Sequence, residues 1–146
     1  MFLAGLALAQ PVAPRDGWVI HPTDRSYEDL LASLRTAVTE NGFGIVTEAG
    51  PTEAAAARGV EIPGNRVVGV FNNDYAVRIL GLSTAAMIEA PVRFYVTEDG
   101  DGTATLSYKT PSFVFLPYTD EGGDLLAALA AELDTRFNEI AQAAIR

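Results

Sequence analysis

Residues 66–111 carry the clearest succession of apolar and polar segments in the chain. The apolar run VVGVF at residues 67–71 is followed by a largely apolar helical segment at residues 73–88, which Gly81 interrupts. The runs VRFYVT at residues 92–97 and TATLSY at residues 103–108 flank the acidic turn EDGDG. Runs rich in β-branched and aromatic residues around a Gly-containing turn are typical of a β-hairpin. This stretch therefore predicts a strand, an interrupted helix and then a hairpin.

Two further segments have the periodicity of amphipathic helices. The first predicts a helix over residues 27–40, with Ser26 as its N-cap and Asn41-Gly42 as its stop, from the spacing of Leu30, Leu31, Leu34 and Val38. The second predicts a long C-terminal helix after the acidic residues 120–124, from the stripe Leu126, Leu129, Leu133, Phe137, Ile140 and Ala144. A stripe of this length must be buried, either against a sheet or against a second subunit.

The remaining segments complete the predicted order of elements. Residues 17–21 and 43–48 are rich in β-formers and predict strands, and residues 51–58 predict a short helix with proline in its first turn. The apolar residues 112–118 predict a further edge strand, which Pro117 weakens. The order β-α-β-α-β-α-β-β-(β)-α predicts an α+β fold, a single two-layer domain with helices packed on an antiparallel-rich sheet.

Composition narrows the classes of protein and partner. A chain of 146 residues with 49% hydrophobic and 20% charged residues predicts one packed domain. The formal net charge of −9 argues against nucleic acid and anionic membranes as partners, because binding to phosphates relies on Lys and Arg. The absence of cysteine from the sequence excludes disulfides and thiolate nucleophiles.

The first nine residues, MFLAGLALA, resemble a short leader. They are apolar and end in a small-x-small pattern typical of signal-peptidase sites, but no basic residue precedes them. They are either a clipped signal peptide or a leader that is not cleaved, and they are too few to span a bilayer. We expect a leader and spacer at residues 1–16, a folded domain at residues 17–146, and a periplasmic or secreted protein that is not inserted in the membrane once the leader is removed. A cytoplasmic location is the alternative.

The central stretch resembles the domain-of-unknown-function family 302, DUF302. The matching parts are VVGVFNN at residues 67–73, ILGLSTAAMIEAP at 79–91, VRFYVTEDG at 92–100 and YKTP at 108–111, preceded by the helix and strand at residues 26–48. The resemblance implies a compact α+β domain grouped with TATA-binding-protein-like folds, a homodimer, and no established activity. The family usually has Gly-Asn-Pro where this chain has Asn72-Asn73-Asp74, and often a proline where Leu82-Ser83 stands.

Most familiar catalytic and metal-binding patterns are missing. His21 is the only histidine and no nucleophile turn accompanies it, so neither a catalytic triad nor a zinc site is expected. The sequence DGDG at residues 99–102 resembles the start of a calcium loop, but position twelve of such a loop would be Thr110 instead of glutamate. Glycines do not form a nucleotide-binding motif either, so we expect no metal and no cofactor.

Basic and aromatic residues gather in the central stretch and form the candidate ligand site. Four of the ten basic residues lie there. Arginine and lysine could hold an anion by charge-assisted hydrogen bonds, and tyrosines could supply an amphipathic wall. The alternative is that each basic residue pairs with one of the surplus acids. The candidate set is Arg66, Asn72, Asn73, Tyr75, Arg78, Arg93, Tyr95, Tyr108 and Lys109.

The apolar segment at residues 79–88 is the candidate interface, with one face in the core and one face toward a partner. Its members are Ile79, Leu80, Leu82, Met87 and Ile88.

Three functions fit these observations. The first is a non-enzymatic, exported binding module for a small apolar or anionic ligand or a protein partner, dimeric through its central helix or a sheet edge. The second is a metal-independent enzyme that uses tyrosine and arginine side chains. The third is a purely structural partner of an envelope protein.

Overall fold

The computed structural model describes residues 10–146, and the leader predicted at residues 1–9 lies outside the described residues. The strands are β1 (Trp18–Pro22), β2 (Gly44–Ala49), β3 (Asn65–Phe71), β4 (Val92–Glu98) and β5 (Ala104–Lys109). The α-helices are α1 (Tyr27–Glu40), α2 (Thr52–Ala57), α3 (Asn73–Leu82), α4 (Pro111–Phe115) and α5 (Thr119–Ile145). Two 3-10 helices, η1 (Ala85–Glu89) and η2 (Leu116–Tyr118), lie between them.

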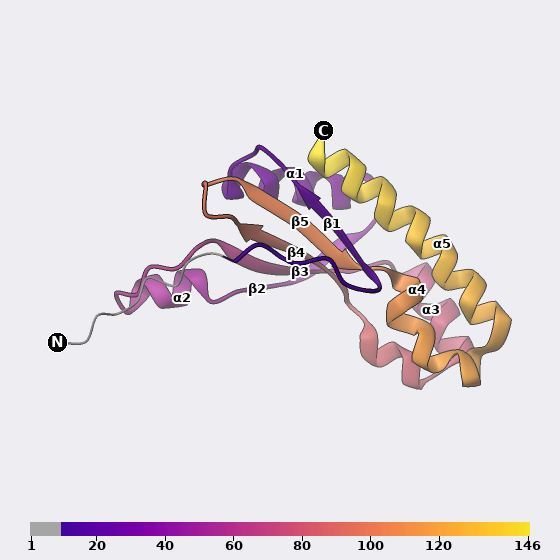
Figure 1. Ribbon diagram of the computed structural model, residues 1–146. Coiled ribbons are helices and arrows are strands. Elements are labelled where there is room, and N and C mark those ends of the chain that lie inside the picture. Colours follow the sequence, from indigo (N-terminus) through magenta and orange to yellow (C-terminus); the bar gives the residue numbers. More distant parts are fainter. Residues whose placement is uncertain (1–9) are drawn as a thin grey trace.

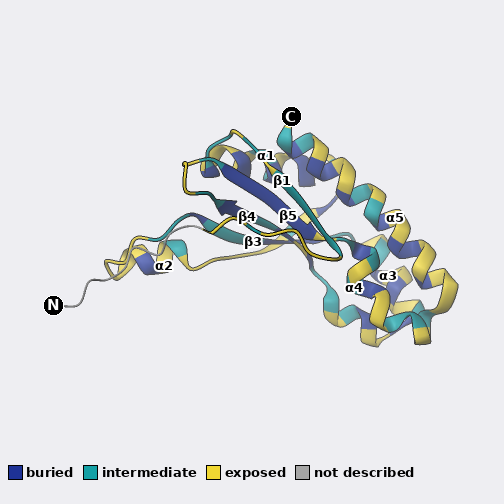
Figure 2. Ribbon diagram, viewed as in Figure 1, coloured by how far each residue is buried: buried dark blue, intermediate teal, exposed yellow. Residues whose placement is uncertain are grey.

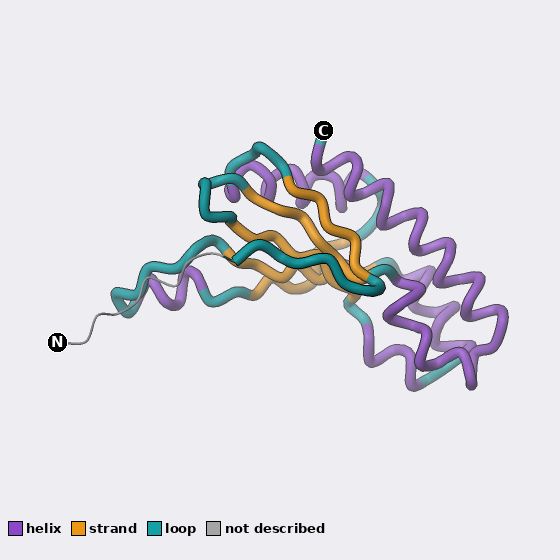
Figure 3. The backbone as a smooth tube through the Cα atoms, viewed as in Figure 1, coloured by secondary structure: helices purple, strands orange, loops and turns teal. Residues whose placement is uncertain are grey.

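The strands form one five-stranded sheet in the order β1-β5-β4-β3-β2, and every neighbouring pair is antiparallel. The predicted hairpin is confirmed as β4 and β5, joined by the acidic turn. Helices α1 and α5 form the second layer, while α3, η1, α4, η2 and the start of α5 gather at one end of the sheet (Figures 1 and 3). We call this group of helices the helical lobe. The predicted two-layer α+β fold is therefore confirmed.

The hydrophobic core lies between one face of the sheet and the helices α1 and α5, and Figure 2 shows buried residues on the facing sides of these elements. Phe137 of α5 stacks on Phe94 of β4, with ring centroids 4.7 Å apart, and lies 5.8 Å from the ring of Tyr108. The predicted C-terminal stripe is buried here, against the sheet within one chain.

The helices begin at the caps that the sequence favours. Ser26 accepts a hydrogen bond from the backbone N–H of Asp29, and α1 spans the predicted residues. Asn72 caps α3 by accepting from the N–H groups of Asp74 and Tyr75. Such side-chain acceptors satisfy N–H groups that have no partner within the helix, which fixes where the chain leaves the sheet and enters a helix.

The edge strand predicted at residues 112–118 is wrong, because this segment is helical. Thr110 is extended and its hydroxyl accepts from the N–H of Phe113, while Pro111 occupies the first turn of α4. Proline is pre-organised for a first helical turn and disfavoured in a strand. The apolar residues of the segment form a short run, and such a run has no period that distinguishes a strand from a helix. The Thr110 cap decides in favour of a helix.

Two helix boundaries also differ from the prediction. Helix α3 continues through Gly81 and ends at Leu82, after which Ser83 is extended and accepts from the N–H of Ala86. At the C-terminal helix, Gly123 has a φ of 63° and separates a short helical turn from the long helix that follows. Within the part of the chain that the structure describes, no helix has the length and apolar character needed to cross a bilayer.

Removing the Phe137 ring should destabilise the fold strongly. Phe137 is 1% exposed and contacts the rings of Phe94 and Tyr108, so Phe137→Ala should lower the free energy of unfolding by about 3–5 kcal/mol. Urea denaturation followed by circular dichroism measures this. The control is Asn138→Ala on the same helix, an exposed position outside the helical lobe that should change the free energy by about 0.5 kcal/mol or less. Equal effects of the two substitutions would contradict the described core.

Candidate ligand-binding site

A pocket of about 290 Å³ lies on the face of the sheet opposite α1 and α5. It reaches toward the helical lobe, from which Glu89 of η1 and Val114 of α4 contribute to its wall. Three adjacent strands and the start of β1 supply the rest of the lining: Trp18, Asn65, Val67, Val92, Arg93, Phe94, Tyr95, Tyr108 and Lys109. Four of the nine predicted ligand residues line this pocket, namely Arg93, Tyr95, Tyr108 and Lys109.

Two cations stand side by side at one end of the pocket. The register pairs Phe94 with Tyr108, so Arg93 and Lys109, the next residues along the two strands, face each other on the open side of the sheet. Like charges directly opposite each other on neighbouring strands destabilise a sheet. Both side chains are exposed, and neither forms an ion pair with an acid among residues 10–146. The pair therefore presents positive charge without a directly bonded carboxylate among the described residues, in a protein of net charge −9.

Trp18 lies beside this pair of cations. It pairs with Lys109 across β1 and β5, and the Lys109 ammonium lies 5.8 Å from the centre of the indole ring. The guanidinium of Arg15 lies 5.3 Å from the same ring. Cations within about 6 Å of an indole face are attracted by its π electrons. The tryptophan thus holds basic groups at the mouth of the pocket and also supplies apolar wall.

The other end of the pocket carries a hydrogen-bonded pair. The amide of Asn65 donates to the hydroxyl oxygen of Tyr95 over 2.6 Å. The Tyr95 hydroxyl proton has no acceptor among the described residues, so it remains free to donate. Between the two polar ends, the side chain of Val67 pairs with Tyr95 across β3 and β4. The pocket is therefore charged at one end, apolar in the middle and polar at the other end.

Tyr108 borders the pocket, but its ring belongs to the core. It is 3% exposed and packs edge-on against Phe94, with ring centroids 5.1 Å apart. Burial, with a smaller contribution from Asp134, raises the pKa of Tyr108 to about 12. Its hydroxyl therefore stays protonated far above neutral pH. A tyrosine in this state is poorly matched to general acid–base catalysis at neutral pH, which favours groups whose pKa lies near the working pH.

Glu89 is the acidic residue in the wall of the pocket. The hydroxyl of Tyr118 donates to its carboxylate over 3.0 Å, and this hydrogen bond raises the pKa of Tyr118. The contact ties η1 to η2 and engages one oxygen of the Glu89 carboxylate.

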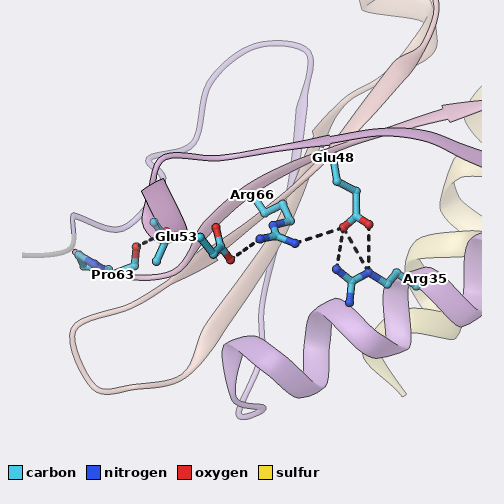
Figure 4. A network of polar contacts seen from close by, with 6 residues as sticks. Arg35, Glu48, Glu53, Pro63 and Arg66 are labelled. Carbon is cyan, nitrogen blue, oxygen red and sulfur yellow. Dashed lines mark hydrogen bonds and ion pairs between the residues drawn. The ribbon is translucent and has the colours of Figure 1, made fainter. Parts of the chain in front are cut away.

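Arg66 lies outside the pocket, in a chain of ion pairs (Figure 4). Its guanidinium hydrogen-bonds to Glu53 of α2 and lies 3.7 Å from Glu48 of β2. Glu48 in turn accepts three hydrogen bonds from Arg35 of α1, the shortest of 2.8 Å. The charge of Arg66 is therefore balanced by neighbouring carboxylates, and the residue ties β3 to α2 and β2.

The four remaining predicted ligand residues serve α3. Arg78 forms two hydrogen bonds with Glu132 of α5, of 3.0 and 3.1 Å, which raise the pKa of Arg78 and lower that of Glu132. Asn72 is the N-cap and Asn73 is the first residue of the helix. Tyr75 stacks on Phe43, with ring centroids 6.0 Å apart. These residues position the helical lobe and do not meet at the pocket.

The five predicted interface residues divide between core and surface. Ile79 is 4% exposed and belongs to the core, so it is not available to a partner. Leu82 and Met87 are partly buried against the core. Leu80 and Ile88 are 50% and 80% exposed, and Val77, which the prediction omits, is 61% exposed.

Seven of the eleven lining residues escaped the sequence analysis, and two of these, Trp18 and Asn65, did so because their neighbours are distant in sequence. Trp18 reaches the pocket only because β1 pairs with β5, and Asn65 only because β3 pairs with β4. The period of two along β1, which puts Trp18 and Ile20 on one face, was the available signal. Among residues 10–146, no cluster of three or more His, Asp or Glu side chains could hold a metal ion.

Comparison with known proteins identifies the family and the fold. No curated protein matches the chain. A crystal structure of an uncharacterized conserved DUF302 protein from Bacillus stearothermophilus superimposes with a TM-score of 0.78 over 90% of this chain and 100% of that one. The two sequences are 17% identical, so this likeness concerns the fold alone.

The family assignment comes from the sequence. The pattern of the domain of unknown function DUF302 matches residues 19–144, from β1 to the last turn of α5. The match covers almost the whole described domain, and the chain therefore belongs to the DUF302 family.

Proposed function

We propose that this protein is a binding module that holds a small anionic molecule with an apolar body in the pocket on the open face of the sheet. The observation that carries the proposal is the pair Arg93 and Lys109, two facing cations without a carboxylate partner among the described residues. An anion bound between them would relieve their mutual repulsion and form charge-assisted hydrogen bonds. The protein as a whole has a net charge of −9, so this pair of cations forms a small basic site on an otherwise acidic protein.

The lining of the pocket supports an apolar ligand body. Trp18, Val67, Val92 and Val114 offer apolar surface beside the cations. Small-molecule sites are mostly apolar concavities with a few placed polar groups, and the volume of about 290 Å³ is at the small end of their range. We infer binding in preference to catalysis, because the pKa of Tyr108 is raised to about 12 and Glu89, the acidic residue of the lining, already accepts a hydrogen bond from Tyr118.

Removing the Arg93 charge should weaken binding of anions. Arg93→Met keeps the aliphatic stem and deletes the guanidinium, and we expect affinity for octanoate or octyl phosphate to fall about tenfold or more, because hydrogen bonds to charged groups contribute roughly 1.5–3 kcal/mol. Isothermal titration calorimetry measures the affinity. Fluorescence gives a second readout, since Trp18 is the single tryptophan of the protein and lines the pocket.

The matched control is Arg58→Met, which removes the same charge from the surface next to α2, outside the pocket. It should leave both affinities unchanged within about twofold. If neither ligand binds to the unaltered protein, or if the two variants weaken binding equally, the anion site is not at Arg93.

We also propose that two copies associate through the helical lobe. The exposed apolar residues Val77 and Leu80 are three positions apart on α3, so they share one face of that helix, and Gly81 beside them leaves room for close approach. Six of the eight large exposed apolar side chains of the described chain lie on this lobe: Val77, Leu80, Ile88, Phe113, Leu116 and Leu125. Concentrated apolar surface of this kind marks association sites, and a second copy would cover it symmetrically.

A charge on this surface should prevent association. Leu80→Glu replaces a half-exposed leucine and should shift the protein from dimer to monomer, as measured by size-exclusion chromatography with light scattering. Val46→Glu on β2 places the same charge at a similarly exposed apolar position away from the lobe and should leave the dimer intact. A monomeric unaltered protein, or a dimer that survives Leu80→Glu, would contradict this proposal.

A further inference from the structure

We infer that the ligand is an elongated carboxylate that carries a hydrogen-bond acceptor at the end far from its charge. This inference rests on the proposed function of the pocket and specifies the class of molecule that it holds. It follows from the order in which three successive rows of side chains cross the open face of the sheet.

The first row is cationic. Arg93 and Lys109 face each other, with Trp18 beyond Lys109 on β1. A carboxylate fits between a guanidinium and an ammonium on neighbouring strands, since its two oxygens can accept from both groups. The acidic wall residue Glu89 already accepts from Tyr118, and its negative charge disfavours a headgroup bearing more than one charge.

The second row contributes Val67 and Tyr95 to the pocket, while Ser107, the partner of Tyr95 on β5, is fully buried and does not line it. Val67 faces the Tyr95 position across β3 and β4, two residues along the strands from the cations. The ligand atoms that follow the carboxylate must therefore pass over a valine side chain and a tyrosine ring. An alkyl chain or a flat ring suits this surface, whereas a hydroxylated sugar would leave its polar groups without partners.

The third row ends the pocket with a free donor. Asn65 pairs across the sheet with Thr97 and lies four residues along the strands from the charged row, which is about 13 Å at the usual rise per residue. The Tyr95 side chain reaches toward Asn65, and the Asn65 side-chain amide donates a hydrogen bond of 2.6 Å to the Tyr95 hydroxyl oxygen. That contact fixes the hydroxyl in place and directs its proton elsewhere. A ligand with a carbonyl or ether oxygen roughly 8 Å from its carboxylate would accept this proton.

The matched ligands octanoate and 7-oxooctanoate test the inference. They share the carboxylate and the chain length, and only 7-oxooctanoate has an acceptor near the far end. We expect 7-oxooctanoate to bind the full protein about threefold to tenfold more tightly by titration calorimetry, because one additional hydrogen bond has that effect on affinity. In Tyr95→Phe, which deletes only the hydroxyl, the two ligands should bind equally.

The control variant is Tyr75→Phe, which removes a tyrosine hydroxyl next to Phe43 and outside the pocket. It should keep the preference for 7-oxooctanoate. Thermal unfolding of both variants checks that Tyr95→Phe folds.

Each outcome has a separate meaning. If both ligands bind equally to the unaltered protein, or if the preference survives in Tyr95→Phe, the distal donor is not used and the inference is overturned while the anion site stands. If octyl phosphate binds and both carboxylates fail, the carboxylate class is wrong. If no anion binds, the proposed function itself fails.

Discussion

The stacking of Phe137 on Phe94 joins the helical layer to the sheet, and the layout of the open face follows from it. Because side chains along a strand alternate between the two faces, a buried Phe94 requires Arg93 and Tyr95 to point away from the helices. The same alternation on β5 buries Tyr108 and turns Lys109 outward. The aromatic core thus sets which residues line the pocket, although most core side chains do not border it.

Charge compensation separates structural arginines from those available to a ligand. Arg66 and Arg78 lie near carboxylates that other elements bring to them, Glu53 and Glu48 in one case and Glu132 in the other. These contacts tie α2 and β2 to β3, and α3 to α5. Exposed ion pairs of this kind contribute little stability individually. They nevertheless neutralise the charges of Arg66 and Arg78, which are then not available to a ligand. On the open face, Lys109 has the indole ring of Trp18 as its neighbour, a ring that Arg15 also approaches.

Local patterns in the sequence predicted most elements of the fold. The helix α1 and the hairpin of β4 and β5 depend on caps, spacing and turn residues that lie within a few positions of each other. The helical segment after β5 was predicted as a strand, because its apolar residues have no unambiguous period and the capping role of Thr110 depends on where β5 ends. Periodicity indicates element type well for long amphipathic segments and poorly for short apolar ones.

The site was less predictable, because it depends on which distant segments pair. Basic residues are few in this acidic chain, and several of them lie in the central stretch. This observation led to the prediction of Arg93 and Lys109 as ligand residues, but also of Arg66 and Arg78. Sequence could not show that Glu132, fifty-four positions after Arg78, would neutralise it. Nor could it show that Trp18 would lie beside Lys109, since that neighbourhood exists only in the folded sheet.

The two outer strands of the sheet also limit how the molecule can meet its neighbours. The edge strand β1 has five residues and ends at Pro22, which has no N–H to offer, and the other edge strand, β2, has an irregular register between Ile45 and Thr47 and carries Glu48. Short strands, proline, bulges and charge are the features that prevent one sheet from continuing into another. The sheet therefore ends within its own chain, and this guards the protein against fibrous, strand-by-strand aggregation at high concentration.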